Sequence, residues 1–402
     1  MDTDVLIAGA GPAGSAAAVH LANAGWRVVV VDRAAFPRDK PCSEYMSPEA
    51  VRLLDRLGVV ADLEAAGAVA LEGTTVVGAR GSRLTGLFSE TEFLPFRPAG
   101  LSLPRRILDA RLVVAAREAG AEVRERTRVE ALLYDAGAVA GALVRGPDGR
   151  HTPIRARLTI GADGLGSLVA RRLGHQRRTR PQRVAFVAHL GGIAGMGRTA
   201  EMHVGDAGYA GLNRVGDDLY NVALVVPQSR AAGARGDATQ FFFDALASFP
   251  GIRGRVDPRR LEREVLVTGP FAARASRVSG PGALLVGDAA DFFDPFTGQG
   301  IYSALRGAEL AAETADGALR THGPITAAAL APYRERRRQA FLGKWAVERL
   351  IGYGMYFPAL FDRAVGRMGR RPAMAHTLIG VTGDFVPAGR VLNPGFLARM
   401  IL

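Results

Sequence analysis

The chain has 402 residues, of which 48% are hydrophobic and 22% charged, and this composition describes a folded protein with a large core rather than a disordered chain. Its net charge of +12, carried mostly by arginine, suits an anionic cofactor and would favour an anionic membrane surface, although a solvated arginine-rich surface is the simpler explanation. No recognised nucleic-acid-binding motif accompanies the charge, so no nucleic-acid partner is expected. The single cysteine, Cys42, excludes an intramolecular disulfide and a thiolate metal cluster, and no metal site is predicted.

A cytoplasmic location is expected from the ends and the hydropathy of the chain. The first strand begins within five residues of Met1, which leaves no room for a signal peptide, and no segment approaches 18 uninterrupted apolar residues. The protein is therefore at most peripherally associated with a membrane.

The first predicted unit runs from Val5 to Asp32 and reads as strand, glycine turn, helix, strand and acid. Gly9 permits a tight turn, Gly11 lets the backbone approach a pyrophosphate, and Gly14 allows close packing of the helix on the strand. The helix N-terminus would present free N–H groups to that pyrophosphate, and Asp32 stands where a ribose hydroxyl needs an acceptor. Because every part is in its required place, dinucleotide binding is favoured over a purely structural glycine turn.

A loop from Arg33 to Ser47 follows and leaves the carboxyl end of the second strand, where open parallel sheets place ligands. Cys42, Ser43 and Tyr45 are therefore candidates for the wall of an active site. Cys42 could equally be a small buried hydrophobe.

Two helices and a strand-rich segment come next. Ser47 as N-cap and Pro48 at the first position predict a helix over 48–57. Residues 67–100 lose the helical pattern, and their Gly and Pro content indicates short strands and loops. A second helix opens near Arg105, which could clamp a dinucleotide phosphate or could be a surface arginine.

Two further glycine-rich turns end predicted strands. In the first, Asp163 follows a short apolar strand, and Ser167 then caps a helix. In the second, a strand delivers Gly287 and Asp288, and the run 297–300 opens another helix. The carboxylate of Asp288 can bind a sugar hydroxyl, and the glycine-rich helix start can donate N–H groups to a ring carbonyl and hold developing negative charge.

Together these blocks resemble the FAD-dependent family that includes para-hydroxybenzoate hydroxylase, related aromatic monooxygenases and the geranylgeranyl reductases. The order is the same: a dinucleotide fingerprint, a DG motif in mid-chain, and a GD motif followed by DPxxGxG at residues 294–300. An R-x-x-[FL]-D element matches residues 105–109. The resemblance spans residues 1 to about 330.

The resemblance implies FAD as cofactor and, because a second GxGxxG is missing, NAD(P)H as a transiently bound reductant. It assigns the adenosine half to the first glycine motif and Asp32, the phosphates and ribityl chain to Arg105, Asp163 and Asp288, and the isoalloxazine to Gly298 and Gly300. The full set of expected cofactor residues is Gly9, Gly11, Ala13, Gly14, Asp32, Arg33, Cys42, Ser43, Arg105, Asp163, Gly287, Asp288, Pro295, Gly298, Gln299 and Gly300.

The expected fold class is α/β, with a Rossmann-like FAD-binding domain of the glutathione reductase type, an inserted antiparallel β-sheet substrate domain and a helical C-terminal region. The expected bounds are 1–66, 101–180 and 275–330 for the FAD-binding domain, 67–100 and 181–274 for the substrate domain, and 331–402 for the C-terminal region. That last region is basic and aromatic, which suits a helix pair on the main body, a cover for an apolar tunnel or a membrane interface.

Within the family the sequence points two ways. Lys40-Pro-Cys42 resembles the K-x-C-G segment of geranylgeranyl reductases, although Ser43 replaces the glycine. The reductases also carry Y-x-W-x-F-P in the substrate domain, whereas the stretch 208–214 keeps only Tyr209. The chain also resembles the flavin halogenases, but it lacks their W-x-W-x-I-P element.

The first functional hypothesis is therefore an FAD-dependent, NAD(P)H-using monooxygenase that hydroxylates an apolar aromatic or quinone-like, polyketide-type compound with molecular oxygen. The alternative is an ene-reductase acting on prenyl chains or quinones, and a flavin-binding protein without turnover is a third hypothesis. A reductase needs a proton donor, for which Cys42 or Tyr45 is a candidate. The expected contacts to a lipophilic substrate are Tyr45, Tyr209, Leu212, Phe293 and Phe296. The sequence does not fix the oligomeric state.

Overall fold

The fold is built on a mixed sheet whose central strands are parallel. The computed structural model describes residues 1–180, 182–234 and 236–401. The order of the sheet is β19 (Ser279–Gly280), β20 (Ala283–Leu285), β11 (His151–Gly161), β1 (Thr3–Ala8), β2 (Val28–Val31) and β8 (Glu122–Arg124), with β9 (Arg128–Asp135) and β10 (Ala138–Arg145) attached to β11. The strands from β20 to β8 pair in parallel, and β9, β10 and β11 form an antiparallel meander.

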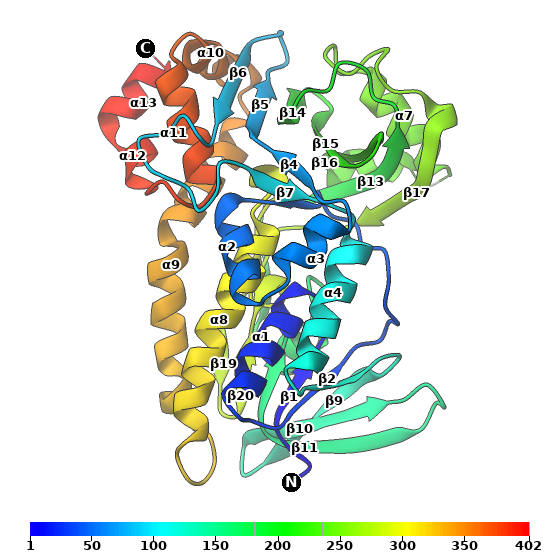
Figure 1. Cartoon of the computed structure of the whole chain (residues 1–402), viewed down its shortest axis with the longest axis vertical. Helices are drawn as coiled ribbons and strands as arrows, with labels where there is room; N and C mark the ends of the chain where they lie inside the picture. Colours follow the sequence, from blue (N-terminus) through cyan, green and yellow to red (C-terminus); the bar gives the residue numbers. More distant parts are fainter. Residues whose placement is uncertain (181, 235, 402) are drawn as a thin grey trace.

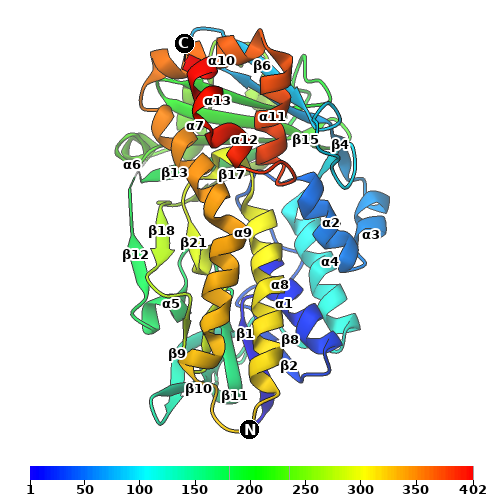
Figure 2. The ribbon, with the colours of Figure 1, turned by 90° about the vertical axis from the view of Figure 1, so that its left-hand side faces the viewer.

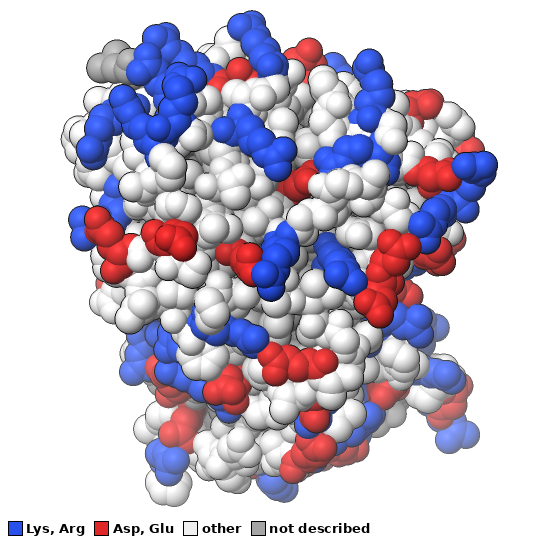
Figure 3. All heavy atoms as spheres, turned by 45° about the horizontal axis from the view of Figure 1, so that its top comes forward, with Lys and Arg blue, Asp and Glu red and all other residues white. Residues whose placement is uncertain are grey.

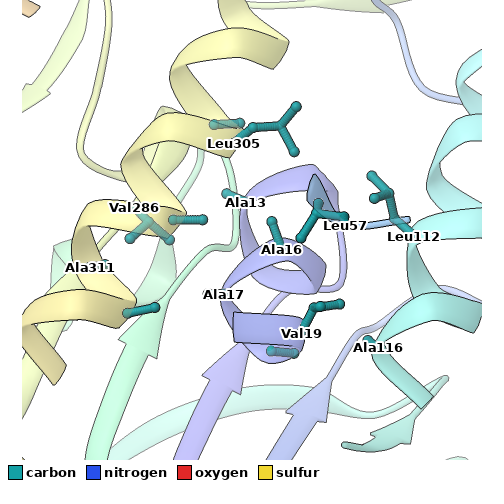
Figure 4. Packing of buried hydrophobic residues seen from close by; sticks show 14 of the residues in the cluster. Ala13, Ala16, Ala17, Val19, Leu57, Leu112, Ala116, Val286, Leu305 and Ala311 are labelled. Carbon is teal, nitrogen blue, oxygen red and sulfur yellow. The ribbon is translucent and has the colours of Figure 1, made fainter. Parts of the chain in front are cut away.

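Helices pack against one face of this sheet (Figure 1). They are α1 (Pro12–Asn23), α4 (Arg105–Glu118) and α8 (Gly300–Leu319), with α2 (Pro48–Arg56) and α3 (Val60–Ala65) beside them. Small side chains let α1 pack between α8 and α4, as Figure 4 shows for Ala13, Ala16 and Ala17. A Cβ atom added at Gly14 would lie 1.8 Å from the carbonyl oxygen of Gly9. Close packing of helix on strand therefore requires glycine there, as predicted.

A second sheet of seven strands stands above the first domain (Figure 1). Its order is β17 (Leu261–Thr268), β13 (Arg183–Gly191), β16 (Leu219–Pro227), β15 (Gly208–Gly216), β14 (Ala200–Gly205), β5 (Gly73–Val77) and β6 (Arg83–Leu87). All pairs are antiparallel except β14 with β5. Phe186 of β13 faces α7 (Ala238–Ala247), whereas its neighbours Ala185 and Val187 face the opposite side, as strand alternation requires. The predicted antiparallel sheet is confirmed, and its role toward a substrate stays a prediction.

Two small sheets join the large ones. The first contains β3 (Tyr45–Met46), β7 (Gly100–Ser102) and β4 (Val69–Leu71), and the second β12 (Gln176–Arg178), β18 (Ala273–Ala275) and β21 (Asp291–Phe292). Short helical segments complete this part of the chain: α5 (Leu168–Arg172), α6 (Gln228–Ala231), η1 (Ala232–Ala234), η2 (Pro258–Arg260), η3 (Gly287–Ala289) and η4 (Pro295–Thr297).

The C-terminal region is helical, as predicted. Helix α9 (Ala327–Gly354) runs beside α8 along the length of the molecule (Figure 2). It leads to α10 (Pro358–Gly369), α11 (Pro372–Thr382), α12 (Gly389–Leu392) and α13 (Pro394–Ile401), which pack on β5 and β6 through one apolar cluster. The expected boundary at residue 331 falls inside α9 rather than between elements.

Local predictions for the helix starts agree with the structure. The hydroxyl of Ser47 accepts a hydrogen bond from the Ala50 N–H at the start of α2, and that of Ser167 accepts one from Ala170 at the start of α5. Within the part of the chain that the structure describes, no helix is long and apolar enough to cross a bilayer.

Candidate cofactor and substrate site

A cavity of about 170 Å³ lies between the carboxyl ends of the parallel strands and the inner face of the seven-stranded sheet. One wall is formed by Gly11, Pro12, Ala13, Ala162, Gly164, Gly287, Asp288, Pro295, Gly298 and Gly300. The loop after β2 and the start of α4 contribute Lys40, Pro41, Cys42, Ser43 and Arg105, and the sheet contributes mainly apolar residues such as Ala185, Val187, Ala223 and Val225. Open α/β sheets bind ligands at this edge.

The first glycine turn leaves room for a ligand. Gly9 has a φ of +101°, which a residue with a Cβ rarely adopts. A Cβ atom at Gly11 would meet only the Arg38 guanidinium, at 3.7 Å, so the space over this residue is open. Asp32 braces the turn, because its carboxylate accepts hydrogen bonds from the N–H groups of Ala10 and Ala34, each at 2.8 Å.

Arg33 and Arg105 do not occupy the positions expected of free phosphate ligands. Arg33 is exposed and does not line the cavity. Arg105 lines it but forms a bidentate ion pair with Asp109, with both N–O distances at 2.7 Å. Burial opposes its charge, yet Asp109 and then Cys42 raise the pKa of its guanidinium. Arg38, which the sequence analysis did not single out, lies beside the open space over Gly11, and it also pairs with Asp109, at 3.1 Å.

Asp163 has one oxygen left for a ligand. Its Oδ2 accepts hydrogen bonds from the N–H groups of Leu168 and Val169 at 2.6 and 3.2 Å, which fixes the start of α5. Its Oδ1 is buried without a partner among the described residues. Burial raises the pKa of this carboxyl group, against the hydrogen bonds it accepts. An unpartnered buried acceptor fits a ligand hydroxyl.

Asp288 and Lys40 both face the cavity, an acid and a base among its lining residues. Burial raises the pKa of Asp288, while Lys40 and Arg105 act in the opposite direction. Burial likewise lowers the pKa of Lys40, and Arg105 lowers it further. The second glycine motif thus supplies an acid beside a cation, which suits a polyhydroxyl chain or a phosphate.

The start of α8 forms the third side of the cavity. Gly298 has a φ of +69°, and its missing side chain leaves space for the ring of Tyr45, since a Cβ would lie 2.8 Å from Tyr45 Cδ1. Gly300 begins the helix and also lines the cavity. The side chain of Gln299 instead donates a hydrogen bond to Asp384 and does not line the cavity. The free N–H groups of this helix start can stabilise negative charge on a bound ring.

Cys42 and Tyr45 line different chambers. Cys42 lines the main cavity, and its sulfur accepts a hydrogen bond from the Glu44 N–H at 3.3 Å. Tyr45 lines a smaller chamber of about 70 Å³ together with Leu212 and Phe296. Burial raises the pKa of Tyr45, so its phenol stays protonated. Ser43, Met202, Gly211, Pro295 and Gly298 border both chambers.

Two predicted substrate contacts are otherwise engaged. The Tyr209 hydroxyl donates to Asp294 at 2.6 Å, and Asp294 also forms a buried ion pair with Arg183. The ring of Tyr209 nevertheless lines the main cavity. Phe293 lines neither chamber and packs on Gly352 of α9, so the prediction that it contacts substrate is not supported by its position.

Sequence reasoning missed a buried polar network behind Cys42. Glu44 is fully buried, and its carboxylate accepts hydrogen bonds from Nε2 of His189 at 2.6 Å, Nδ2 of Asn221 at 2.9 Å and the Arg105 N–H at 2.8 Å. Arg263 lies 3.6 Å away. Glu44 has a φ of +58°, a conformation that costs a residue with a Cβ about 1–2 kcal/mol. Its side-chain bonds therefore hold the loop in place.

The site as a whole fits FAD. The open space over Gly11, and Asp288 with the helix start at Gly300, line one cavity and provide for a pyrophosphate, a sugar and a ring. The unpartnered Oδ1 of Asp163 lies between Ala162 and Gly164, which line the same cavity. Within the described residues no cluster of three or more potential metal ligands occurs. The fold and site define a flavoprotein of the oxidoreductase class.

Comparison with known proteins identifies the family. Residues 2–202 match the model of the FAD binding domain family, and the chain belongs to that family. It is 32% identical over 342 residues to a menaquinone reductase from Mycolicibacterium smegmatis, covering 80% of this chain and 77% of that protein. It is 32% identical over 349 residues to digeranylgeranylglycerophospholipid reductase 1 from Methanopyrus kandleri, covering 85% and 87%.

The solved structures include a flavoprotein/dehydrogenase from Cytophaga hutchinsonii with a TM-score of 0.84 and 20% identity, covering 99% of this chain and 96% of that one. This likeness confirms the fold. The family confirms the resemblance on which the FAD prediction depends. The choice between monooxygenase and reductase, the use of NAD(P)H and the roles of individual residues stay predictions.

Proposed function

We propose that this protein is a flavin ene-reductase that saturates a carbon–carbon double bond in a lipophilic isoprenoid or quinone-like substrate. The observation that carries the proposal is the position of Cys42, on the wall of the same cavity as Gly298 and Gly300 and opposite an apolar roof. The reductase names of two relatives support it.

Saturation of the bond needs a hydride at one carbon and a proton at the other. When bound and reduced by a nicotinamide cofactor, FAD would supply the hydride. The thiol of Cys42 donates the proton to the second carbon, and the thiolate regains a proton from solvent. Neither step changes the oxidation state of the sulfur.

The remaining residues bind, orient and exclude water. Asp163 and Asp288 would hold hydroxyl groups of the cofactor, and Arg38 and Lys40 would offset its phosphate charge. Ala185, Val187 and Val225 form an apolar roof that positions a hydrocarbon substrate and keeps water from the reacting carbons. Glu44 holds the Cys42 loop against the substrate sheet through His189 and Asn221.

Hydroxylation of an aromatic ring is the second candidate. The chamber beside Tyr45 has a volume of only about 70 Å³ and is lined by Leu212 and Phe296, which suits a ring better than a long chain. The aromatic element expected of the reductases is also incomplete around Tyr209.

Product analysis distinguishes the two. The FAD-loaded protein would be incubated with NADPH, labelled oxygen gas and a panel of polyprenyl compounds, quinones and alkyl phenols, and the products analysed by mass spectrometry. A reductase yields a product that gains two hydrogen atoms and no label. A product that gains one labelled oxygen atom would establish the monooxygenase and refute the reductase.

A further inference from the structure

An apolar protrusion stands at the junction of α9 and α10. The five consecutive residues from Tyr356 to Leu360 are all exposed and uncharged, with Tyr356 at 51% and Phe357 at 63%. Tyr353, one turn earlier on α9, is 50% exposed. We call Tyr353, Tyr356, Phe357 and Leu360 the apolar tip. Large aromatic side chains gathered in one exposed segment mark an interaction surface rather than ordinary scatter.

A row of arginines continues from this tip along α10. Leu360, Arg363 and Arg367 are spaced at three and four residues, so they share one face of the helix. Ala364, Val365 and Met368 occupy the other face and are buried. Arg370 and Arg371 follow at the end of the helix. We call Arg363, Arg367, Arg370 and Arg371 the arginine row.

The arginine row carries uncompensated charge. Among the residues that the structure describes, none of its members forms an ion pair. Desolvation and the neighbouring guanidiniums of Arg363, Arg371 and Arg370 lower the pKa of Arg367, which shows how closely the four lie. The nearest acid in sequence, Asp362, accepts a hydrogen bond from the Arg80 N–H.

The whole C-terminal region also carries a net positive charge. Residues 331–402 contain twelve Lys or Arg and four Asp or Glu, and so hold eight of the twelve net positive charges of the chain. Figure 3 shows Lys and Arg side chains gathered at the upper left of this end of the molecule, with few acidic side chains among them. Such a field attracts an anionic surface.

We propose that the apolar tip and the arginine row together dock this protein on an anionic lipid bilayer. Tyr356, Phe357 and Leu360 enter the interfacial region, where aromatic rings are well accommodated, and the row contacts anionic headgroups. A second copy of the chain is a poor occupant, because a symmetric pair would bring two arginine rows together. The surface is thus complementary in both polarity and charge to a membrane.

The docking surface lies next to the candidate site. Phe361 directly follows the apolar tip, and its ring packs edge-to-face on Phe296 with centroids 6.3 Å apart. Phe296 lines the smaller chamber. The Tyr356 ring also lies 5.3 Å from the guanidinium carbon of Arg183, which is paired with Asp294. A lipid-borne substrate would therefore arrive one aromatic ring away from the chamber, although docking itself does not depend on the proposed reaction.

Vesicle flotation tests the proposal with the full-length, FAD-loaded protein. The vesicles contain phosphatidylcholine alone or phosphatidylcholine with one third phosphatidylglycerol. Two variants target the surface: Phe357→Ser with Leu360→Ser, and Arg363→Gln with Arg367→Gln, Arg370→Gln and Arg371→Gln. A matched control removes four exposed arginines outside the row by Arg27→Gln, Arg150→Gln, Arg198→Gln and Arg259→Gln.

We expect the parent and the matched control to float with phosphatidylglycerol vesicles and to stay in solution with phosphatidylcholine alone. Each surface variant should lose affinity by about tenfold or more: the serine variant because it removes the apolar area that enters the interface, and the glutamine variant because each Arg near an anionic surface contributes severalfold. Failure of the parent to float with either vesicle would overturn the proposal. So would equal loss in the matched control, or a stable dimer in solution that Phe357→Ser with Leu360→Ser disrupts. None of these outcomes depends on catalytic activity, so the proposed reaction and the docking surface can fail separately.

Discussion

The carboxylate of Glu44 and the ring of His189 meet at 2.6 Å in the interior, and this hydrogen bond fastens the Cys42 loop to β13 of the seven-stranded sheet. Asn221 pairs with His189 across β13 and β16 and donates to the same carboxylate. The sheet that roofs the cavity therefore holds the loop that forms its wall. Substitutions in β13 or β16 that displace His189 or Asn221 should therefore shift the position of Cys42.

Glu44→Gln should loosen this loop. The amide cannot accept all the hydrogen bonds that converge on the carboxylate, so we expect a loss of about 1–3 kcal/mol in the free energy of unfolding. Because Cys42 is the single cysteine, the rate of its reaction with an aromatic disulfide reagent reports on the loop alone. That rate should rise at least several-fold in Glu44→Gln and remain that of the parent in Glu264→Gln, which alters an exposed acid on β17. Equal rates in all three proteins would contradict the positioning role.

This network also shows where sequence reasoning stopped. Ser47 acts on the N–H of Ala50, and Gly14 on the carbonyl of Gly9 in the same motif, so both roles could be predicted from local spacing. Glu44 acts on partners 145 and 177 residues distant, which only the pairing of β13 with β16 brings together. A buried carboxylate in a loop of charged residues leaves no periodic signal in one sequence.

Arg105 is a different case, because a signal was present. Arg105 and Asp109 are four residues apart on α4, the spacing at which helical side chains meet. The pair could have been expected, and with it the partial neutralisation of Arg105. Arg38 lies in an irregular segment, so its approach to Gly11 depends on the folded path of the loop.

Gly11→Val should remove the cofactor without unfolding the protein. Gly11 has a φ of −73°, which any residue can adopt, and a Cβ there meets only Arg38 at 3.7 Å. The branched side chain would instead fill the pyrophosphate space. We expect purified Gly11→Val to lack yellow flavin and to melt within a few degrees of the flavin-free parent.

Gly14→Ala provides the contrast. Its Cβ would overlap the Gly9 carbonyl, so we expect a loss of about 2 kcal/mol or more in the free energy of unfolding, measured on flavin-free protein. Stoichiometric flavin in purified Gly11→Val would refute the assignment of the pyrophosphate site.

Cys42→Ser tests the proton donor. A serine hydroxyl is a much weaker acid than a thiol, so we expect the rate of product formation to fall about 100-fold, the usual contribution of a positioned acid. Flavin content and the rate of flavin reduction by NADPH should be those of the parent, because neither requires this proton. Product formation at the parent rate would leave Cys42 as a wall residue and direct attention to Tyr45.

Glu201 should make acid stability depend on one carboxylate. Burial tends to raise the pKa of Glu201, but hydrogen bonds from His203 and Arg255 prevail and lower it from 4.5 to about 2. Between these values the unfolded chain binds the proton and the folded chain does not, so this contribution to stability is present above pH 4.5 and is lost as the pH falls towards 2. Allowing for solvent screening, we expect about 2 kcal/mol from this group.

Urea unfolding at pH 6 and at pH 3 isolates this contribution when the parent is compared with Glu201→Gln. Other carboxylates titrate in both proteins and cancel in the comparison. The parent should lose more stability than Glu201→Gln on acidification, because only the parent carries the carboxylate that Arg255 holds at 2.7 Å. Glu262→Gln, which alters an exposed acid on β17, should lose as much stability as the parent between pH 6 and pH 3. If Glu201→Gln and the parent lose the same stability between the two pH values, Glu201 does not remain ionised in the folded protein below its ordinary range.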